Sequence, residues 1–278
     1  MSEAETISRV KQPNTVATLT RDLRALGLAE GSVVIVHSSL SAIGWTAGGP
    51  QAVVEALLTA VGERGTIVMP THTTQYSDPA GWQAPAVPES WIEIIRRERP
   101  AFHPALTPTR GMGAVVECFR THPRAKRSLH PLYSFAAAGP LADEMTRQSL
   151  DDSMGEHSPL AHLYARDALV LLLGVDHGNN TSLHLAEYRS GVPAKREYYD
   201  LFVQVDAPPP GREGRRCVHF SDRELDSEGF AFIGAEWEKQ ASDNDLTVAH
   251  VGAVASRLLR QRPVVDYAAK RLPELRST

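Results

Sequence analysis

The sequence has few cysteines and no excess of basic residues. Only two cysteines, Cys118 and Cys217, occur among 278 residues, and their wide separation fits neither a disulfide framework nor a pair of metal ligands. Lysine and arginine number 29 against 33 aspartates and glutamates, so the clustered positive charge that binds nucleic-acid phosphates is missing. These shortages predict a protein of a reducing compartment whose partners do not include nucleic acid.

Long apolar runs are also missing. The longest covers residues 168–175, far short of the roughly 20 residues that span a bilayer. The first 13 residues are polar and mixed in charge, without the apolar core of a secretory signal, and we expect them to be flexible. The sequence therefore predicts a soluble, cytoplasmic protein with no membrane partner.

Short β-branched or leucine-rich runs alternate with amphipathic stretches, which is typical of an α/β protein. No repeat, low-complexity tract or linker interrupts the pattern, so we predict a single domain over residues 1–278, with a central mixed sheet flanked by helices. The expected strands cover residues 33–37, 66–70, 134–138 and 168–175, and the expected helices cover residues 16–28, 49–61, 90–99, 113–121, 141–147, 159–165 and 263–272.

The stretch after Lys195 is aromatic and alternating. Residues 197–205 and 215–220 predict a hairpin whose turn is the Pro208–Gly211 segment, too rich in proline to carry ladder hydrogen bonds. Residues 251–261 fit a helix or a strand equally well.

The segment from Ala168 to Glu187 is the richest in chemistry. A buried strand ends in a polar turn, and a helix capped by Asn180 or Thr181 then presents His184 and Glu187. A spacing of three puts both side chains on one helix face, so the carboxylate can hold one ring nitrogen while the other takes a proton. The plainer interpretation is a satisfied, half-buried histidine near a surface charge.

Two further strands end in turns rich in hydroxyl groups. His37-Ser38-Ser39-Leu40-Ser41 follows the first, and Thr71-His72-Thr73 follows the second. Each turn alone is also compatible with ordinary capping. Because sites in α/β proteins gather at the carboxyl ends of strands, three such ends indicate one shared cleft.

Several familiar motifs do not occur. The chain has no Gly-x-Ser-x-Gly elbow and no Walker-type phosphate loop, and Gly111-Met112-Gly113 lacks the later glycine of a dinucleotide site. Eleven histidines leave a metal-dependent hydrolase as an alternative, with His157, His177 and His184 plus Asp176 or Glu187 as ligands. No two histidines stand four residues apart within one clear helix, so we predict no metal.

Five segments together resemble the aminoglycoside 3-N-acetyltransferase family. They lie in order between about residues 16 and 272, and the Arg-Ser-x-His-Pro and Leu-His-x-Ala-Glu pieces are specific in combination. The resemblance implies the fold of these antibiotic acetyltransferases, which differs from that of the common acetyltransferase superfamily, and acetyl-CoA as cosubstrate. The matching segments are His37–Leu40, Met69–Thr71, Arg127–Gly139, Glu156–Pro159 and Gly174–Glu187.

By this resemblance, His184 is the catalytic base, Glu187 is its partner, and Thr73 or a neighbouring backbone N–H stabilises the oxyanion of the thioester. The acetyl group would pass directly to the amine in a ternary complex. Arg127 would lie near the phosphates of CoA. The residues implied to contact CoA are Ser38, Ser39, Leu40, Ser41, Thr71, His72, Thr73, Met112, Arg127 and Ser128.

The resemblance also implies a cationic aminoglycoside as acceptor, and its acetylation would give antibiotic resistance. We expect a basic patch around Arg127 and an acidic one around residues 151–156, which meet at His184. An atypical amine from a biosynthetic pathway is the alternative acceptor, because Gln75 and Tyr76 replace an acidic residue of some members. A CoA-binding protein without activity is a third possibility, and a homodimer is left open. The expected acceptor contacts are Tyr76, Asp78, Asp152, Glu156 and His157.

Overall fold

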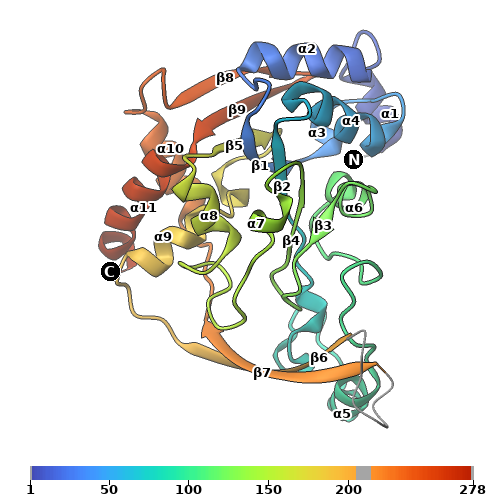
Figure 1. Ribbon diagram of the computed structural model, residues 1–278, viewed down its shortest axis with the longest axis vertical. Coiled ribbons are helices and arrows are strands. Elements are labelled where there is room, and N and C mark those ends of the chain that lie inside the picture. The colour runs from blue at the N-terminus through green and yellow to red at the C-terminus, as the bar shows by residue number, and fades with distance from the viewer. Residues whose placement is uncertain (1, 205–213, 277–278) are drawn as a thin grey trace.

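A seven-stranded mixed sheet organises the fold (Figure 1). The computed structural model describes residues 2–204 and 214–276. The three central strands, β2, β1 and β5, run parallel, and antiparallel strands flank them on both sides. In spatial order the strands are β3 (Lys126–Arg127), β4 (Phe135–Ala138), β2 (Thr66–Pro70), β1 (Val33–Ser38), β5 (Leu169–Leu173), β9 (Val254–Arg260) and β8 (Leu246–Val251).

Helices cover both faces of this sheet, and the alternation of side chains along the strands explains how. In β1, Val34 and Val36 belong to the cluster under the first set of helices, whereas Ile35 belongs to the cluster on the opposite face. The first set is α2 (Val16–Leu26), α4 (Gly49–Val61) and α6 (Ala114–Arg120); the second is α7 (Ala142–Met145), α8 (Pro159–Ala165), α9 (Leu183–Arg189), α10 (Phe230–Glu238) and α11 (Gln261–Arg276).

A two-stranded hairpin, β6 (Arg196–Gln204) and β7 (Arg215–Arg223), forms a separate sheet beside α5 (Glu89–Glu98) at the bottom of Figure 1. It packs over a third apolar cluster that includes Tyr76, Phe102 and Leu132. The predicted pairing of the two strands is confirmed. The predicted turn at Pro208–Gly211 lies outside the described residues.

The predicted fold class is confirmed, because the chain forms one α/β domain with a mixed sheet between helices. Residues 251–261, which fitted either element type, contain β9, and the last helix begins at Gln261 rather than at Pro263. Helix α2, predicted over residues 16–28, ends at Leu26 because Gly27 turns the chain with a φ of 112°. Among the described residues, no helix is both long and apolar enough to cross a bilayer.

Within the N-terminal segment that we expected to be flexible, the structure has a helix, α1 (Glu3–Ser8). Its first turn is closed by reciprocal hydrogen bonds between Ser2 and Glu5. Trp45 holds this helix, since its indole N–H donates to the Glu3 carboxylate and its backbone N–H donates to Thr6 O. The short helix α3 (Leu40–Ile43) lies close by in Figure 1.

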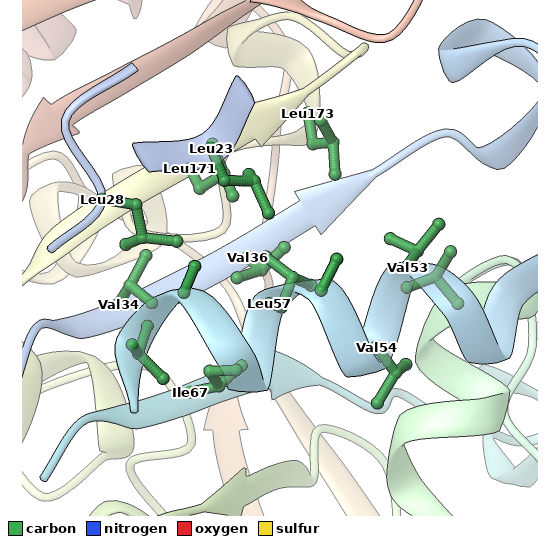
Figure 2. Close-up of a cluster of buried hydrophobic side chains, with 14 of the residues drawn as sticks. Leu23, Leu28, Val34, Val36, Val53, Val54, Leu57, Ile67, Leu171 and Leu173 are labelled. Carbon is green, nitrogen blue, oxygen red and sulfur yellow. The ribbon is translucent and has the colours of Figure 1, made fainter. Parts of the chain in front are cut away.

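The core between α4 and the sheet is closely packed. Figure 2 shows apolar side chains of α4 between that helix and the strands β1 and β2. Leu57 is fully buried in this cluster, together with Val34, Val36 and Ile67. This layer supports the strands whose ends form the site described below.

Replacing Leu57 tests the importance of this layer. Leu57→Ala removes buried methyl groups and leaves a cavity, so we expect the free energy of unfolding to fall by about 3 kcal/mol. Leu106 is 76% exposed, and Leu106→Ala should change it by less than about 0.5 kcal/mol. Urea unfolding of both variants measures the difference, and equal losses would contradict this account of the core.

Candidate active site

A cavity of about 700 Å³ opens where the three parallel strands end. Strand β1 contributes Val36, His37 and Ser38 to its wall, β2 contributes Pro70, and Val175 follows β5. The expectation that the three strand ends share one cleft is therefore met. Its volume lies in the range of ordinary ligand sites.

A large part of the wall comes from the segments that follow β1 and precede α6. The predicted CoA contacts Ser38, Ser39, Leu40, Ser41 and Met112 all line the cavity. Two lining residues, His37 and Ser38, each carry a buried side-chain atom, Nε2 and Oγ, that has no hydrogen-bond partner. Such atoms are expected to be satisfied by a ligand or by water. The helices α3 and α6 begin at this wall. The backbone N–H groups in the first turn of a helix can donate hydrogen bonds to carbonyl or phosphate oxygens of a ligand.

The outer wall was not anticipated from the sequence. Ser2, Glu3 and Thr6 of the N-terminal segment line the cavity beside Trp45. Among the described lining residues there is no lysine or arginine. The basic patch that we expected around Arg127 therefore does not form part of this wall.

Arg127 has a different position from the one predicted. Its guanidinium donates to Thr71 O at 2.7 Å, to Thr107 O at 2.6 Å and to Pro104 O at 3.1 Å, and its Nε approaches the hydroxyls of Thr71 and Ser134. Burial, followed by the neighbouring Arg120, lowers its pKa to about 10. With all its nitrogens engaged within the protein, Arg127 joins the turn after β2 to the 104–107 loop and is not offered to phosphates.

Thr71, Thr73 and Ser128 also have internal roles. The Thr73 hydroxyl donates to Pro131 O at 2.6 Å and its backbone N–H donates to Leu132 O at 2.7 Å, so neither donor is free for an oxyanion. The Thr71 and Ser134 hydroxyls are 3.0 Å apart. Ser128 Oγ donates to Gln148 and accepts from the backbone N–H of Phe135. These side chains support the turns around the site, and a backbone N–H next to Thr73 stays the predicted oxyanion donor.

Arg127→Met separates a structural from a phosphate-binding role. Losing several buried hydrogen bonds should lower the free energy of unfolding by about 3 kcal/mol. The KM for acetyl-CoA should change less than about twofold, because the cavity wall does not contain this side chain. Arg124→Met, at an exposed neighbouring arginine, is the control. A tenfold rise in KM with unchanged stability would show that Arg127 binds the phosphates.

His184 and Glu187 are brought together as predicted. Both lie on α9, and His184 Nδ1 contacts the Glu187 carboxylate. The edge of the His184 ring packs on Phe230, with 4.9 Å between ring centroids. Since Nδ1 faces Glu187, the other ring nitrogen, Nε2, is left to exchange protons. Thr181, one helical turn earlier, lines the cavity.

Glu187 is not the surface charge of the plainer interpretation. Its side chain is fully buried, and a buried carboxylate must be paired and hydrogen-bonded. Besides His184, it receives the Arg276 guanidinium at 2.7 Å and the backbone N–H of Asp226 at 3.2 Å. Arg276 and Asp226 could not be assigned to Glu187 from the sequence, because they lie 89 and 39 positions away from it in the chain.

Other histidines lie near His184 but remain neutral. Burial, followed by repulsion from His177 and His184, lowers the pKa of His37 to about 3. Burial, followed by repulsion from His184 and His37, does the same for His72. His72 was predicted to contact CoA, but it packs edge-on against Tyr133 and Phe135 and does not line the cavity.

Buried neutral histidines predict sensitivity to acid. The pKa of His37 is about 3 and that of His130, mainly through burial, about 4 in the folded chain, against an ordinary value of 6.5. Between pH 7 and pH 5 the unfolded chain binds protons that the folded chain does not, so the free energy of unfolding should fall as pH falls. Each ring contributes at most about 1.4 kcal/mol per pH unit.

Urea unfolding at pH 7, 6 and 5 measures this slope. His37→Gln should make it shallower by about the share of one ring, or about 1 kcal/mol per pH unit. His250 is exposed, and His250→Gln serves as the matched control that should leave the slope unchanged. A His37→Gln slope as steep as that of the parent would contradict the burial argument.

The three histidines of the metal alternative lie in different settings. His177 is buried, and its Nε2 is 2.9 Å from Glu238 Oε1. It packs closely on Gly234, where an added Cβ would lie 2.0 Å from the ring. His157 is exposed. Within the described ranges, no group of three or more histidine, cysteine, aspartate or glutamate side chains is arranged to hold a metal ion.

Three of the expected acceptor contacts have protein partners. Tyr76 is buried in the cluster beneath the hairpin, with the Arg99 guanidinium 4.9 Å from its ring. Asp78 pairs with Arg96 at 2.7 Å and lines a different cavity, next to the hairpin. Glu156 accepts two hydrogen bonds from Arg189. Their charges are therefore already compensated, and Tyr76 is a packing residue.

Asp152 lies in an acidic cluster that it forms with Asp222, not only with its neighbours in the 151–156 segment as we expected. Its carboxylate accepts the backbone N–H of His157 at 2.7 Å, and burial, opposed by this bond, raises its pKa. Asp222 of β7 is fully buried nearby and accepts from the Tyr188 hydroxyl at 2.7 Å and from the backbone N–H of Ser153 at 2.9 Å. Tyr188 follows His184 by one helical turn on α9, so the cluster borders the dyad. Asp222 was missed because the hairpin strand gave no local signal of chemistry.

Comparison with known sequences agrees with this geometry. The chain matches the family model for aminoglycoside 3-N-acetyltransferase over residues 35–273. It is 43% identical over 260 residues to the SPbeta prophage-derived aminoglycoside N(3')-acetyltransferase-like protein YokD of Bacillus subtilis (strain 168), covering 93% of this chain and 92% of that protein. Aminoglycoside N(3)-acetyltransferase VII of Streptomyces paromomycinus is 36% identical, covering 99% of this chain and 96% of that protein.

Solved structures agree as well. The crystal structure of YokD from Bacillus subtilis matches with a TM-score of 0.91 and 40% identity, covering 99% of each chain. AAC-IIIb in a binary complex with CoASH matches with a TM-score of 0.81 and 27% identity, over 95% of this chain and 98% of that one. AAC-VIa bound to sisomicin matches with a TM-score of 0.79 and 29% identity, over 95% and 99%. This chain belongs to the aminoglycoside 3-N-acetyltransferase family of acetyl-CoA-dependent acyltransferases.

Proposed function

We propose that this protein transfers the acetyl group of acetyl-CoA directly to an amine of an aminoglycoside, with His184 as base and Glu187 as its partner. The contact between His184 Nδ1 and the buried Glu187 carboxylate carries the proposal. Neither residue lines the strand-end cavity, but Thr181, just before α9, does. Membership of the family supports the choice of both substrates.

The proposed base has a defined task. An aminoglycoside amine is protonated in water and must lose its proton before its lone pair attacks the thioester carbonyl. His184 Nε2 takes that proton while Glu187 holds the opposite edge of the ring and stabilises the imidazolium that forms. The new C–N bond replaces the C–S bond, and the sulfur of CoA leaves as a thiolate. The second proton, which the nitrogen loses as the amide forms, goes to that thiolate, and His184 returns the first proton to water.

Direct transfer is favoured over a covalent acetyl-enzyme. Among the described residues, no cysteine lines the cavity. Cys118 lies on α6 within the core, where burial raises the pKa of its thiol, and Cys217 lies on the hairpin. Holding both substrates together supplies the orientation that a bimolecular reaction in water lacks.

The acceptor site is proposed at Asp152, which is partly exposed, with the fully buried Asp222 behind it holding Tyr188 and Ser153 in place. A carboxylate close to the dyad suits a cationic ligand. Exposed His157, whose backbone is bonded to Asp152, borders the same region. Acetylation removes the positive charge of one amine, which weakens the binding of an aminoglycoside to RNA phosphates, and resistance would follow. Because acetyl-CoA is a cytoplasmic metabolite, we assign the enzyme to the cytoplasm.

Substitution of the dyad tests the mechanism. His184→Gln removes the proton acceptor and should lower kcat about 1,000-fold, while the Kd of CoA, measured by calorimetry, should change less than about threefold. Release of free thiol from acetyl-CoA in the presence of an aminoglycoside measures turnover, and His250→Gln is the control. Normal turnover by His184→Gln would exclude this residue as the base.

The same thiol assay tests the acceptor. A panel of aminoglycosides should give amine-dependent release of CoA, with the acetylated position read by NMR of the product. Silence across the panel, with CoA still bound, would favour an atypical amine acceptor of a biosynthetic pathway. This second candidate is supported by the engagement of Tyr76, Asp78 and Glu156 within the protein.

A further inference from the structure

The Glu187 carboxylate is surrounded by donors from three separate parts of the chain. His184 contacts one oxygen, Oε2, from the same helix. The other oxygen, Oε1, accepts from the backbone N–H of Asp226, in the loop between β7 and α10, and from Arg276 Nη1 on α11. Arg276 is thus the cation that faces the back of the dyad.

Arg276 is held firmly in this position. Its side chain is only 17% exposed, and its second terminal nitrogen, Nη2, donates to Asp226 O and lies 3.5 Å from the Asp226 carboxylate. It is the last residue of α11, which packs along α9. The residues that match the family model end at 273, so Arg276 lies outside the matched range.

The other groups around the dyad carry little competing charge. His37 on β1 and His72 after β2 are neutral above about pH 5, because burial lowers their pKa to about 3. From α10, the dyad meets the apolar ring of Phe230. On α9 itself, Tyr188 is bonded to Asp222 and Arg189 to Glu156. The charges in contact with Glu187 are those of Arg276 and, through it, Asp226.

If no other cation were present, the negative charge of a fully buried carboxylate would be compensated most easily by a protonated imidazole. His184 would then be charged already and could not accept a proton from the substrate amine. A permanent cation on the opposite oxygen removes this demand, because arginine stays charged at every working pH. It also fixes the carboxylate plane that orients the His184 ring.

We propose that Arg276 is a positioning residue for the reaction: it keeps Glu187 ionised and oriented while leaving His184 neutral and ready to act as base. The inference rests on the proposed function of His184. It adds to the dyad a third member, supplied by the final turn of the last described helix.

The test separates charge from hydrogen bonding. Arg276→Gln keeps an N–H donor but removes the cation, so the acidic limb of the kcat/KM profile should move up by about one pH unit, with about a tenfold loss of activity on that limb. At pH 9 the loss should shrink to less than about threefold. Arg276→Lys keeps the positive charge on a shorter side chain. The acidic limb of its kcat/KM profile should therefore move by less than half of the shift seen in Arg276→Gln.

Arg271→Met is the matched control, because Arg271 lies on the same helix and pairs with Glu236 and Glu274 away from the dyad; it should leave the limb in place. Circular dichroism and thermal unfolding check that each variant folds, and Arg276→Lys keeps the test open if Arg276→Gln does not. A loss equal at every pH, or an equal shift in the Gln and Lys variants, would overturn the proposal.

NMR titration of the His184 ring gives a readout that does not need turnover. The midpoint in Arg276→Gln should move upward by the same amount as the acidic limb, and an unmoved midpoint would overturn the inference. If His184→Gln retains activity, the proposed base is wrong, yet the ring titration still reports whether Arg276 controls protonation of the dyad. The two failures are therefore distinguishable.

Discussion

The burial of the Glu187 carboxylate is the constraint on which the site depends. A carboxylate removed from water is tolerated only where donors replace its hydration, and here they come from α9, from the loop before α10 and from α11. These elements are far apart in sequence, so the charge can be stabilised only when the second face of the sheet is assembled. Formation of the dyad and packing of the C-terminal helices are therefore parts of one event.

The sheet determines where this charge meets the substrates. Strands β2, β1 and β5 run parallel, so their polar turns emerge at one edge, and the alternation of side chains sends successive residues of β1 to opposite faces. His37 shares the face of Ile35, toward α9, whereas Ser38 follows on the other face. The strand-end cavity and the dyad thus lie on neighbouring sides of the same strand end.

Local signals predicted much of this arrangement. Strands β1, β2, β4 and β5, the hairpin strands, most helices, the shared cleft and the His184–Glu187 pair follow from periodicity, capping and short spacing, whereas β3 and β8 were not predicted and the range of β9 fitted either element type. Arg127, Thr73 and Tyr76 were assigned to ligands because a sequence does not reveal which backbone carbonyls or rings a side chain will meet after folding. Asp222 and Arg276 could not be predicted for the same reason, since their partners lie 34 and 89 positions away. Helix α10 was not predicted because its apolar residues are not confined to one side of the helix, so the sequence lacks the period of an amphipathic helix.

The distribution of charge explains why His184, among several nearby histidines, suits the role of base. His37 and His72 lack an anionic partner, and burial holds both pKa values near 3, so a proton taken from the acceptor would not rest on them. His184 alone among these three contacts a carboxylate. Repulsion between the rings further penalises a second protonated histidine. Under the proposed mechanism, a proton that leaves the amine would thereby be directed to one ring, near the Asp152 carboxylate proposed for the acceptor.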